Sequence, residues 1–374
     1  MRPLTRAAPV RSTPHVSSDP PEPFRYEALP MRVRFGPGVA GDLVAEVDDL
    51  TLGSLLVVCT PGHRELAERL SEPLRHRRAG LLDGARMHVP QEDADRARAE
   101  AQRLGADGLL AVGGGSAIGL AKAVALTTGL PVVAVPTTYA GSEMTSIWGI
   151  SDGTTKRTGR DRRVLPVSVL YDPALTLSLP VEVSVTSGMN ALAHAAEALY
   201  APDRSPVVSL MADDGIRRLV RALPRIVSAP TDLGARTSAL YGAWLCGACL
   251  GATTMSLHHR LCHALGGVSS LPHAATHTVV LPHVLALNLP AVPDVASRLE
   301  QALGGPGSAG AQLYELAALL GAPSSLRSLG MPETDLTTVV DQVLSAPYAN
   351  PRPVSRLDLV DLLARAWSGA PPRT

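Results

Sequence analysis

The chain has 374 residues and no formal net charge, because 34 Lys and Arg balance 34 Asp and Glu. A protein that binds nucleic acid needs a basic surface, so this balance excludes nucleic acid as the expected partner. Apolar runs such as residues 129–135 are far shorter than the roughly 20 residues that span a bilayer. Its four cysteines lie in apolar or helical stretches with no secretory segment before them, so we expect a cytoplasmic protein without a disulfide framework.

Residues 1–23 are rich in Pro, Ser and Arg and show no hydrophobic periodicity, so we expect a disordered extension. Beyond them, short apolar runs alternate with helical patterns, which predicts a parallel sheet covered by helices over residues 24–178. The cluster at residues 75–78, three arginines and a histidine, is typical of a solvated helix face. The expected strands are Leu55–Cys59, Gly108–Val112, Pro131–Val135 and Val167–Tyr171, and the expected helices are Arg64–Leu74 and Ala117–Thr127.

Residues 179–374 show only helical patterns, with Ala, Gly and Leu faces and with Pro or Gly at each junction. The expected helices are Ser184–Tyr200, Pro206–Leu223, Asp232–Ala252, Leu257–Gly266, Asp294–Leu303, Ala309–Leu320, Glu333–Ala346 and Arg356–Trp367. The predicted fold class is therefore α/β plus all-α, with an N-terminal parallel-sheet domain and a C-terminal helical domain.

A glycine-rich turn separates the strand Gly108–Val112 from the helix that follows it. Its residues are Gly113, Gly114, Gly115 and Ser116. Glycines let the backbone approach a ligand, and free amides at a helix N-terminus attract a pyrophosphate. The turn is either an ordinary structural turn or a dinucleotide site, and its place between strand and helix favours the second. It is not a P-loop, because Lys122 lies too far along the chain.

A second polar turn follows the next strand, at residues 136–143, and it contains Thr137, Thr138 and Ser142. Ligands of open α/β sheets bind at the carboxyl ends of the strands, so this turn is a second candidate for cofactor binding. Thr60 ends the first strand, where a carboxylate would select NAD through the ribose hydroxyls. Residues 60–63 carry no carboxylate, so we expect NADH and NADPH both to be accepted.

Seven of the eleven histidines lie between His194 and His283. His194 follows Asn190 by four residues, and His263 follows His259 by four, so each pair shares one helix face. Imidazoles at this spacing are a natural chelating arrangement, and without a metal they donate protons and hold carboxylates.

Three further histidines, His273, His277 and His283, come after an expected bend at residues 266–267. With a pair of imidazoles on one helix face, a third histidine is enough to complete a metal site with one open position. Because position 190 is a neutral amide and a poor ligand, a cation there would lack charge compensation. Metal binding and metal-free acid–base chemistry both remain open on the residues alone.

With these segments placed, the chain resembles the iron-containing alcohol dehydrogenase and dehydroquinate-synthase-like superfamily. The matching stretches are residues 35–38, 113–116, 136–138, 259–273 and 281–283. The resemblance implies an N-terminal nucleotide-binding domain, a C-terminal catalytic domain and a substrate site between them. It also places family metal ligands at Asn190, His194, His259 and His273, with His263 lining the substrate site.

The finer resemblance is to the maleylacetate reductase subgroup, through the stretches GGGSAIGLAKAVAL, VPTTYAGSEMT, VTSGMNALAHAAEALYAPD and HHRLCHALGG. It implies NAD(P)H-dependent reduction of maleylacetate to 3-oxoadipate by a homodimer. In that subgroup Asn at position 190 is usual and no metal is expected. Ser270 and Ala275 replace two carboxylates of the usual pattern, which leaves the substrate itself open.

Hydride addition to a carbon–carbon double bond conjugated to a ketone develops negative charge on an enolate oxygen. His259 and His263 are the candidates to stabilise that charge and to deliver the proton. Lys156, Arg157 and Arg160 either anchor substrate carboxylates or belong to a solvated loop. Two alternatives remain: a metal-dependent alcohol dehydrogenase of the same fold, and a non-redox biosynthetic homologue.

Overall fold

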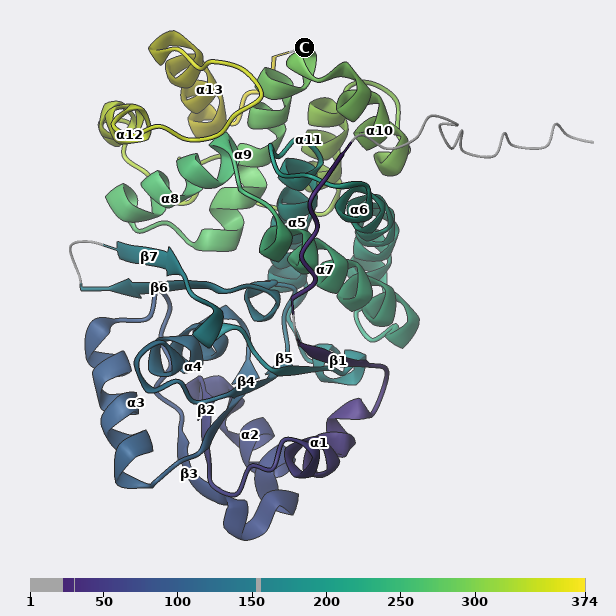
Figure 1. Cartoon of the computed structure of the whole chain (residues 1–374). Coiled ribbons are helices and arrows are strands. Elements are labelled where there is room, and N and C mark those ends of the chain that lie inside the picture. The colour runs from purple at the N-terminus through teal and green to yellow at the C-terminus, as the bar shows by residue number, and fades with distance from the viewer. Residues whose placement is uncertain (1–22, 30, 153–155, 374) are drawn as a thin grey trace, which may run out of the picture.

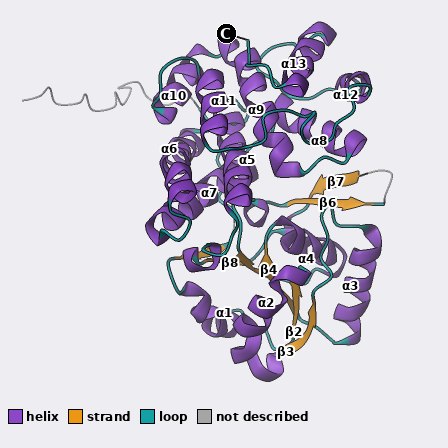
Figure 2. Ribbon diagram, turned by 180° about the vertical axis from the view of Figure 1, so that it is seen from behind, coloured by secondary structure: helices purple, strands orange, loops and turns teal. Residues whose placement is uncertain are grey.

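The computed structural model describes residues 23–29, 31–152 and 156–373 (Figure 1). The predicted disordered extension falls, except for Pro23, outside the described residues. A strand-containing domain forms one half of the molecule and a helical domain forms the other, as predicted from the alternation of patterns (Figures 1 and 2).

The first domain is built on six parallel strands in the order β1-β8-β5-β4-β2-β3. Its strands are β1 (Arg32–Phe35), β2 (Leu55–Cys59), β3 (Arg78–Leu82), β4 (Gly108–Gly113), β5 (Val132–Pro136) and β8 (Ser168–Tyr171). Its helices are α1 (Leu43–Asp49), α2 (Arg64–Ser71), α3 (Gln91–Arg103) and α4 (Gly115–Thr128).

Strands β2, β4 and β5 lie inside the sheet, and every one of their residues is buried. Successive side chains of a strand point to opposite faces. Leu56 and Val58 therefore pack toward α3 and α4, and Leu55 and Val57 toward α1 and α2. A strand covered on both faces needs a continuous apolar run, which is why these strands were visible in the sequence.

The sequence analysis did not predict α1, α3, the helix His273–Asn288 or the strands at the edges. Strands β1 and β3 are edge strands, and an antiparallel hairpin of β6 (Ile147–Ser151) and β7 (Lys156–Arg160) lies outside the main sheet. Arg75, His76 and Arg78 are exposed, as predicted, but residues 75–78 do not form one helix face, because Arg75 has a φ of 53° and Arg78 begins β3. Edge strands are covered less and so tolerate polar residues.

The second domain is helical throughout its described length. Its helices are α5 (Val181–Leu199), α6 (Pro206–Ser228), α7 (Leu233–Ala252), α8 (Leu257–Ser269), α9 (His273–Asn288), α10 (Pro293–Leu303), α11 (Ala309–Leu319), α12 (Asp335–Leu344) and α13 (Arg356–Ser368). Helix α5 is the central one and packs on α6, α7 and α9. Small residues allow this closeness: a β-carbon on Gly188 would come within 2.7 Å of Leu223 Cδ2.

No single described helix is long and apolar enough to cross a membrane; only α7 and α8 together pass by length and composition, and they meet at a 94° bend. The four cysteines are free and buried.

The bend expected at residues 266–267 is also misplaced. Helix α8 continues through both glycines to Ser269. The chain turns at Ser270, which has a φ of 51°, and α9 begins at His273 directly after Pro272. Glycine is tolerated near a helix end, and here the packing of α8 on α9 and α12 keeps the last turn helical.

Candidate active site

The glycine-rich turn and the second polar turn lie side by side, because β4 and β5 are neighbours in the sheet. Gly113 has a φ of 141°, a conformation that favours glycine. A β-carbon on Gly114 would lie 2.8 Å from Thr138 Cγ2, so the turns touch at this point. No side chain caps the first amides of α4 in the described structure. Free amides next to a turn of glycines, which carry no side chains, fit the pyrophosphate of a dinucleotide. A dinucleotide is the ligand predicted for this turn.

His63 connects the end of β2 to the second polar turn, and the sequence analysis missed it. Its Nδ1 is 2.8 Å from Thr60 Oγ1, and its Nε2 is 3.0 Å from Thr137 Oγ1. Burial lowers the pKa of His63. The imidazole therefore links the ends of β2 and β5 across the end of β4. A lone histidine after a strand gave no signal of this role.

Lys122 supports the second polar turn from behind. Its Nζ donates to the carbonyl of Ser142 at 2.8 Å, to the carbonyl of Thr145 at 2.7 Å and to Thr145 Oγ1 at 3.0 Å. The side chain is fully buried, and burial lowers its pKa to about 7. The available signal was a single Lys in an otherwise apolar helix.

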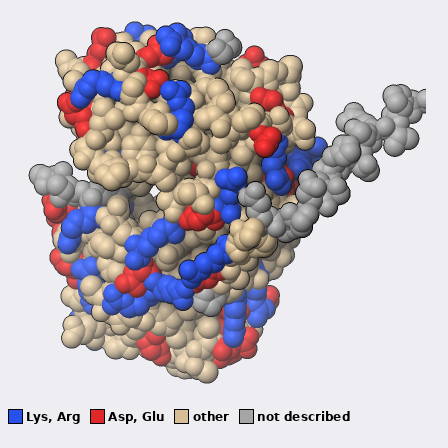
Figure 3. Space-filling model, turned by 45° about the horizontal axis from the view of Figure 1, so that its top comes forward, with Lys and Arg blue, Asp and Glu red and all other residues tan. Residues whose placement is uncertain are grey.

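The two domains meet where the second polar turn touches α5 and α7. Gly141 has a φ of 76°, and a β-carbon there would lie 3.1 Å from Gly247 Cα and 3.3 Å from His194 Nδ1. His194 of the helical domain therefore faces the second polar turn of the first domain. In Figure 3 a hollow separates the two domains at one side, and on this face Lys and Arg are interspersed with Asp and Glu.

Six imidazoles from α5, α8 and α9 gather at this junction. The ring centroid of His259 lies 5.2 Å from that of His194, 5.3 Å from His258, 6.5 Å from His263 and 5.0 Å from His277. His273 completes the group, 4.2 Å from His277 and 6.4 Å from His263. His263 is exposed and His273 is half-buried, whereas the other four are buried.

Glu197 is the buried carboxylate of this cluster, and the sequence analysis did not identify it. Its Oε2 lies 2.7 Å from His259 Nδ1. Its two oxygens also accept from the backbone N–H groups of Ser256 (3.0 Å), His258 (2.8 Å) and His259 (3.4 Å). It therefore caps the N-terminus of α8 and orients His259 together. Its position three residues after His194, on the same face of α5, was the available signal.

The buried imidazoles of the cluster are neutral at pH 7. Burial lowers the pKa of His258 to about 4 and that of His259 to about 3. It lowers the pKa values of His194 and His277 well below the ordinary range. Burial raises the pKa of Glu197, while the backbone donors of α8 lower it. Because Nδ1 of His259 faces a carboxylate, its Nε2 is left as a proton acceptor.

The other predicted residues are distributed around this centre. Asn190 is buried beside His194 on α5, with Oδ1 unpartnered. His283 instead faces Tyr314 of α11, with ring centroids 6.5 Å apart.

Arg157 of the hairpin donates to Gln91, and Arg160 donates to the carbonyls of Gly251 and Thr253. Arg160 thus fastens the hairpin to the end of α7 and is not available as an anchor for substrate. Lys156 begins β7, and its side chain lies outside the described residues.

The four positions that the resemblance assigns to metal ligands do not form a fitting iron site. Asn190, His194, His259 and His273 supply an amide and three imidazoles but no carboxylate to offset a divalent charge. Within the described residues, the one group of three metal-ligating side chains is a different set: His258, His259 and His277. No step of the reaction derived below passes through a metal.

Comparison with known proteins identifies the protein family. Residues 30–173 match the iron-containing alcohol dehydrogenase family, and residues 184–367 match the C-terminal part of the Fe-containing alcohol dehydrogenase family. The chain therefore belongs to the iron-containing alcohol dehydrogenase family, whose members are oxidoreductases. Within it, the chain is a member of the maleylacetate reductase subgroup, as the following relatives show.

The maleylacetate reductase of Pseudomonas sp. (strain P51) is 52% identical over 350 residues, which cover 94% of this chain and 99% of the relative. The maleylacetate reductase of Pseudomonas knackmussii is 53% identical over 349 residues, which cover 93% and 99%. The crystal structure of maleylacetate reductase from Agrobacterium tumefaciens superimposes with a TM-score of 0.90 at 48% identity, covering 94% of this chain and 100% of that one.

Proposed function

We propose that this protein reduces maleylacetate to 3-oxoadipate with NADH or NADPH. The observation that carries the proposal is the 52% identity to a maleylacetate reductase over 94% of the chain. The approach of the second polar turn to His194 supports it, because a hydride donor bound to the first domain would then lie against the imidazole cluster of the other. The test is NADH oxidation in the presence of maleylacetate, with 3-oxoadipate identified as the product. Turnover of simple alcohols and none of maleylacetate would overturn the proposal.

The first domain binds and orients the cofactor. The uncapped amides of Gly115 and Ser116 at the start of α4 would hold the pyrophosphate, and Thr137 and Thr138 would line the path toward the helical domain. When bound, the reduced nicotinamide supplies the hydride for the carbon–carbon double bond. Gly141 keeps the second polar turn against His194, so this path ends at the imidazole cluster.

We divide between His259 and His263 the roles that the sequence analysis gave to both. His263 is exposed and therefore able to exchange its proton with solvent, so we assign to it the donation to the enolate and the delivery of the proton. His259 is buried, and Glu197 keeps its proton on Nδ1. We assign to His259 the acceptor Nε2 that orients substrate or water at the inner wall of the site.

The substrate carboxylates need partners, and of the anchors expected in the hairpin Arg160 already donates to the carbonyls of Gly251 and Thr253. Helix α9 has sixteen residues, and in the described structure no side chain caps its N-terminus at Pro272. Its first amides and the adjacent imidazoles of His263 and His273 form a group of donors next to the exposed side of the cluster. We propose that they hold one carboxylate, through the partial positive charge of a helix N-terminus.

NADPH is expected to replace NADH with a catalytic efficiency within about a hundredfold, or about 2.7 kcal/mol. The reason is that Thr60 and His63 stand at the end of β2 without a carboxylate to repel a 2′-phosphate. Steady-state rates with both cofactors at saturating maleylacetate measure this. A larger preference for NADH would show that another group discriminates, and Thr60→Asp is the matched variant that should create such a preference.

Activity is expected to survive exhaustive chelation, because Asn190 removes the charged ligand from the family metal positions. The measurement is turnover before and after dialysis against a strong chelator, with metal content determined on the same samples. Loss of activity on removal of one tightly held ion per chain, with recovery on its return, would contradict it.

The homodimer expected from the resemblance stays a prediction, and sedimentation equilibrium is the measurement that tests it.

A further inference from the structure

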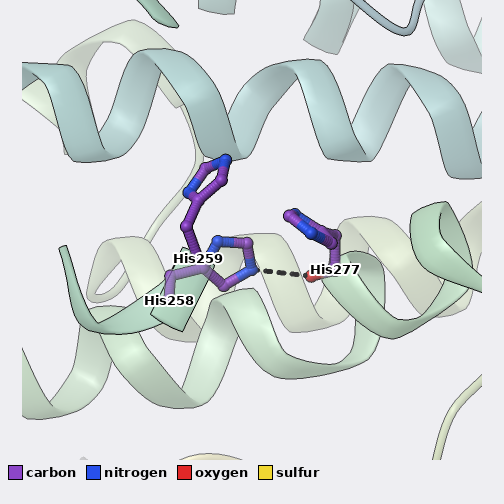
Figure 4. Close-up of side chains that lie close together, drawn as sticks. All are labelled: His258, His259 and His277. Atoms are coloured by element: carbon purple, nitrogen blue, oxygen red, sulfur yellow. Dashed lines mark hydrogen bonds between the residues drawn. The ribbon is translucent and has the colours of Figure 1, made fainter. Parts of the chain in front are cut away.

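Three buried imidazoles lie close together inside the helical domain. The nitrogens through which they face one another have no hydrogen-bond partner in the described structure. These imidazoles belong to His258 and His259 on α8 and His277 on α9 (Figure 4). One nitrogen of each lies within 4.8 Å of the other two. The unpartnered buried nitrogens are His258 Nδ1, His259 Nε2 and both nitrogens of His277. Buried polar groups are almost always satisfied, so such a cluster requires an explanation.

The protonation of two of these rings is set by their outer partners. His258 Nε2 lies 3.1 Å from the carbonyl oxygen of His277, which only accepts, so the proton of His258 is on Nε2. His259 Nδ1 lies 2.7 Å from Glu197 Oε2, so the proton of His259 is on Nδ1. The inner nitrogens of both rings are therefore lone pairs. His277 has no such partner and is free to present a third lone pair.

We propose that His258, His259 and His277 form a binding site for a divalent transition-metal ion of the zinc class. Neutral imidazole nitrogens are preferred ligands of such ions, and three of them leave one position open. The site shares only His259 with the four family positions. The proposed reduction needs no metal, but it uses His259, so an ion in this site competes with that reaction.

Glu197 supplies the nearest negative charge to the proposed site, through His259, which this site shares with the family positions. It is a fully buried carboxylate that holds the far nitrogen of His259, an arrangement in which the outer carboxylate raises the basicity of the ligand. Its negative charge offsets part of the charge of a divalent ion without contacting it. The path of an ion from solvent to the site is short, because the ring of His277 is next to that of the half-buried His273. The two ring centroids are 4.2 Å apart. Since the ion would take Nε2 of His259, its binding slows turnover.

The test is a titration of the chelator-treated full-length protein with Co²⁺, followed by its visible d–d absorption and by competition with Zn²⁺. We expect one equivalent with the intense bands of a four- or five-coordinate ion. The bands should be lost in His258→Gln and His277→Gln and retained in the matched variants His194→Gln and His273→Gln. Glu197→Gln should weaken binding by about 10- to 100-fold. Added Zn²⁺ should inhibit maleylacetate reduction, and chelator should restore it.

The opposite pattern, with bands lost in His194→Gln and His273→Gln but kept in the other pair, would overturn the proposal in favour of the family positions. Absence of binding by the wild-type protein, or binding unaffected by any of the four substitutions, would also overturn it. If a variant fails to fold, crystals of the wild-type protein soaked in Co²⁺ decide the matter by anomalous diffraction. A peak among His258, His259 and His277 supports the site, and a peak elsewhere or none overturns it.

Discussion

His263→Ala is expected to lower the turnover number by about a hundredfold or more, the usual cost of removing a general acid together with stabilisation of an oxyanion. His263 is the exposed imidazole of the cluster, so it is the one that exchanges protons with solvent. His259→Ala is expected to cost a similar factor, because it removes the acceptor that Glu197 orients. Cofactor affinity should be nearly unchanged, since the pyrophosphate site at residues 113–116 belongs to the other domain.

Single-turnover hydride transfer and cofactor titration, each on the same folded samples, separate catalysis from packing. His76→Gln is the matched control, because His76 is exposed on the first domain, far along the chain from the cluster. If His259→Ala lowers only the melting temperature and leaves hydride transfer per folded molecule intact, it is a packing residue. Wild-type rates in a folded His259→Ala, His263→Ala double variant would end the catalytic assignment of both.

The protein is expected to lose several kcal/mol of unfolding free energy between pH 7 and pH 5. Six described histidines have pKa values lowered by burial: His63, His194, His258, His259, His277 and His283. Below the ordinary pKa of 6.5 the unfolded chain binds protons that the folded chain does not. Stability therefore falls as pH falls, by up to about 2 kcal/mol per fully buried histidine at pH 5.

Three described carboxyls oppose this trend, because burial raises the pKa values of Glu143, Glu197 and Asp213. They are fewer than the histidines, so the net slope keeps its sign. Urea unfolding at a series of pH values measures the slope. For His258, whose pKa is lowered to about 4, substitution by Gln should reduce the loss between pH 7 and pH 5, and His76→Gln should not. A stability that is flat or rises toward pH 5 would refute the prediction.

The sequence by itself determined the fold class and the central elements. Strands β2, β4 and β5 are covered on both faces. Each is therefore a continuous apolar run, which can be recognised in the sequence as a buried strand. Gly113 was also predictable as a turn glycine, because its φ of 141° favours glycine whatever surrounds it. The helical pairs Asn190 with His194 and His259 with His263 followed from a spacing of four residues alone.

Only the tertiary structure decided which of these residues meet. Glu197 and His259 are separated by 62 residues and join at 2.7 Å because α5 packs beside the start of α8. Lys122 and Thr145 meet in the same way across the first domain. Local patterns depend on the period of a helix or strand, whereas these contacts depend on how helices pack against one another and against the sheet. The tautomers, the burial and the grouping of His258 and His277 with His259 are consequences of that packing.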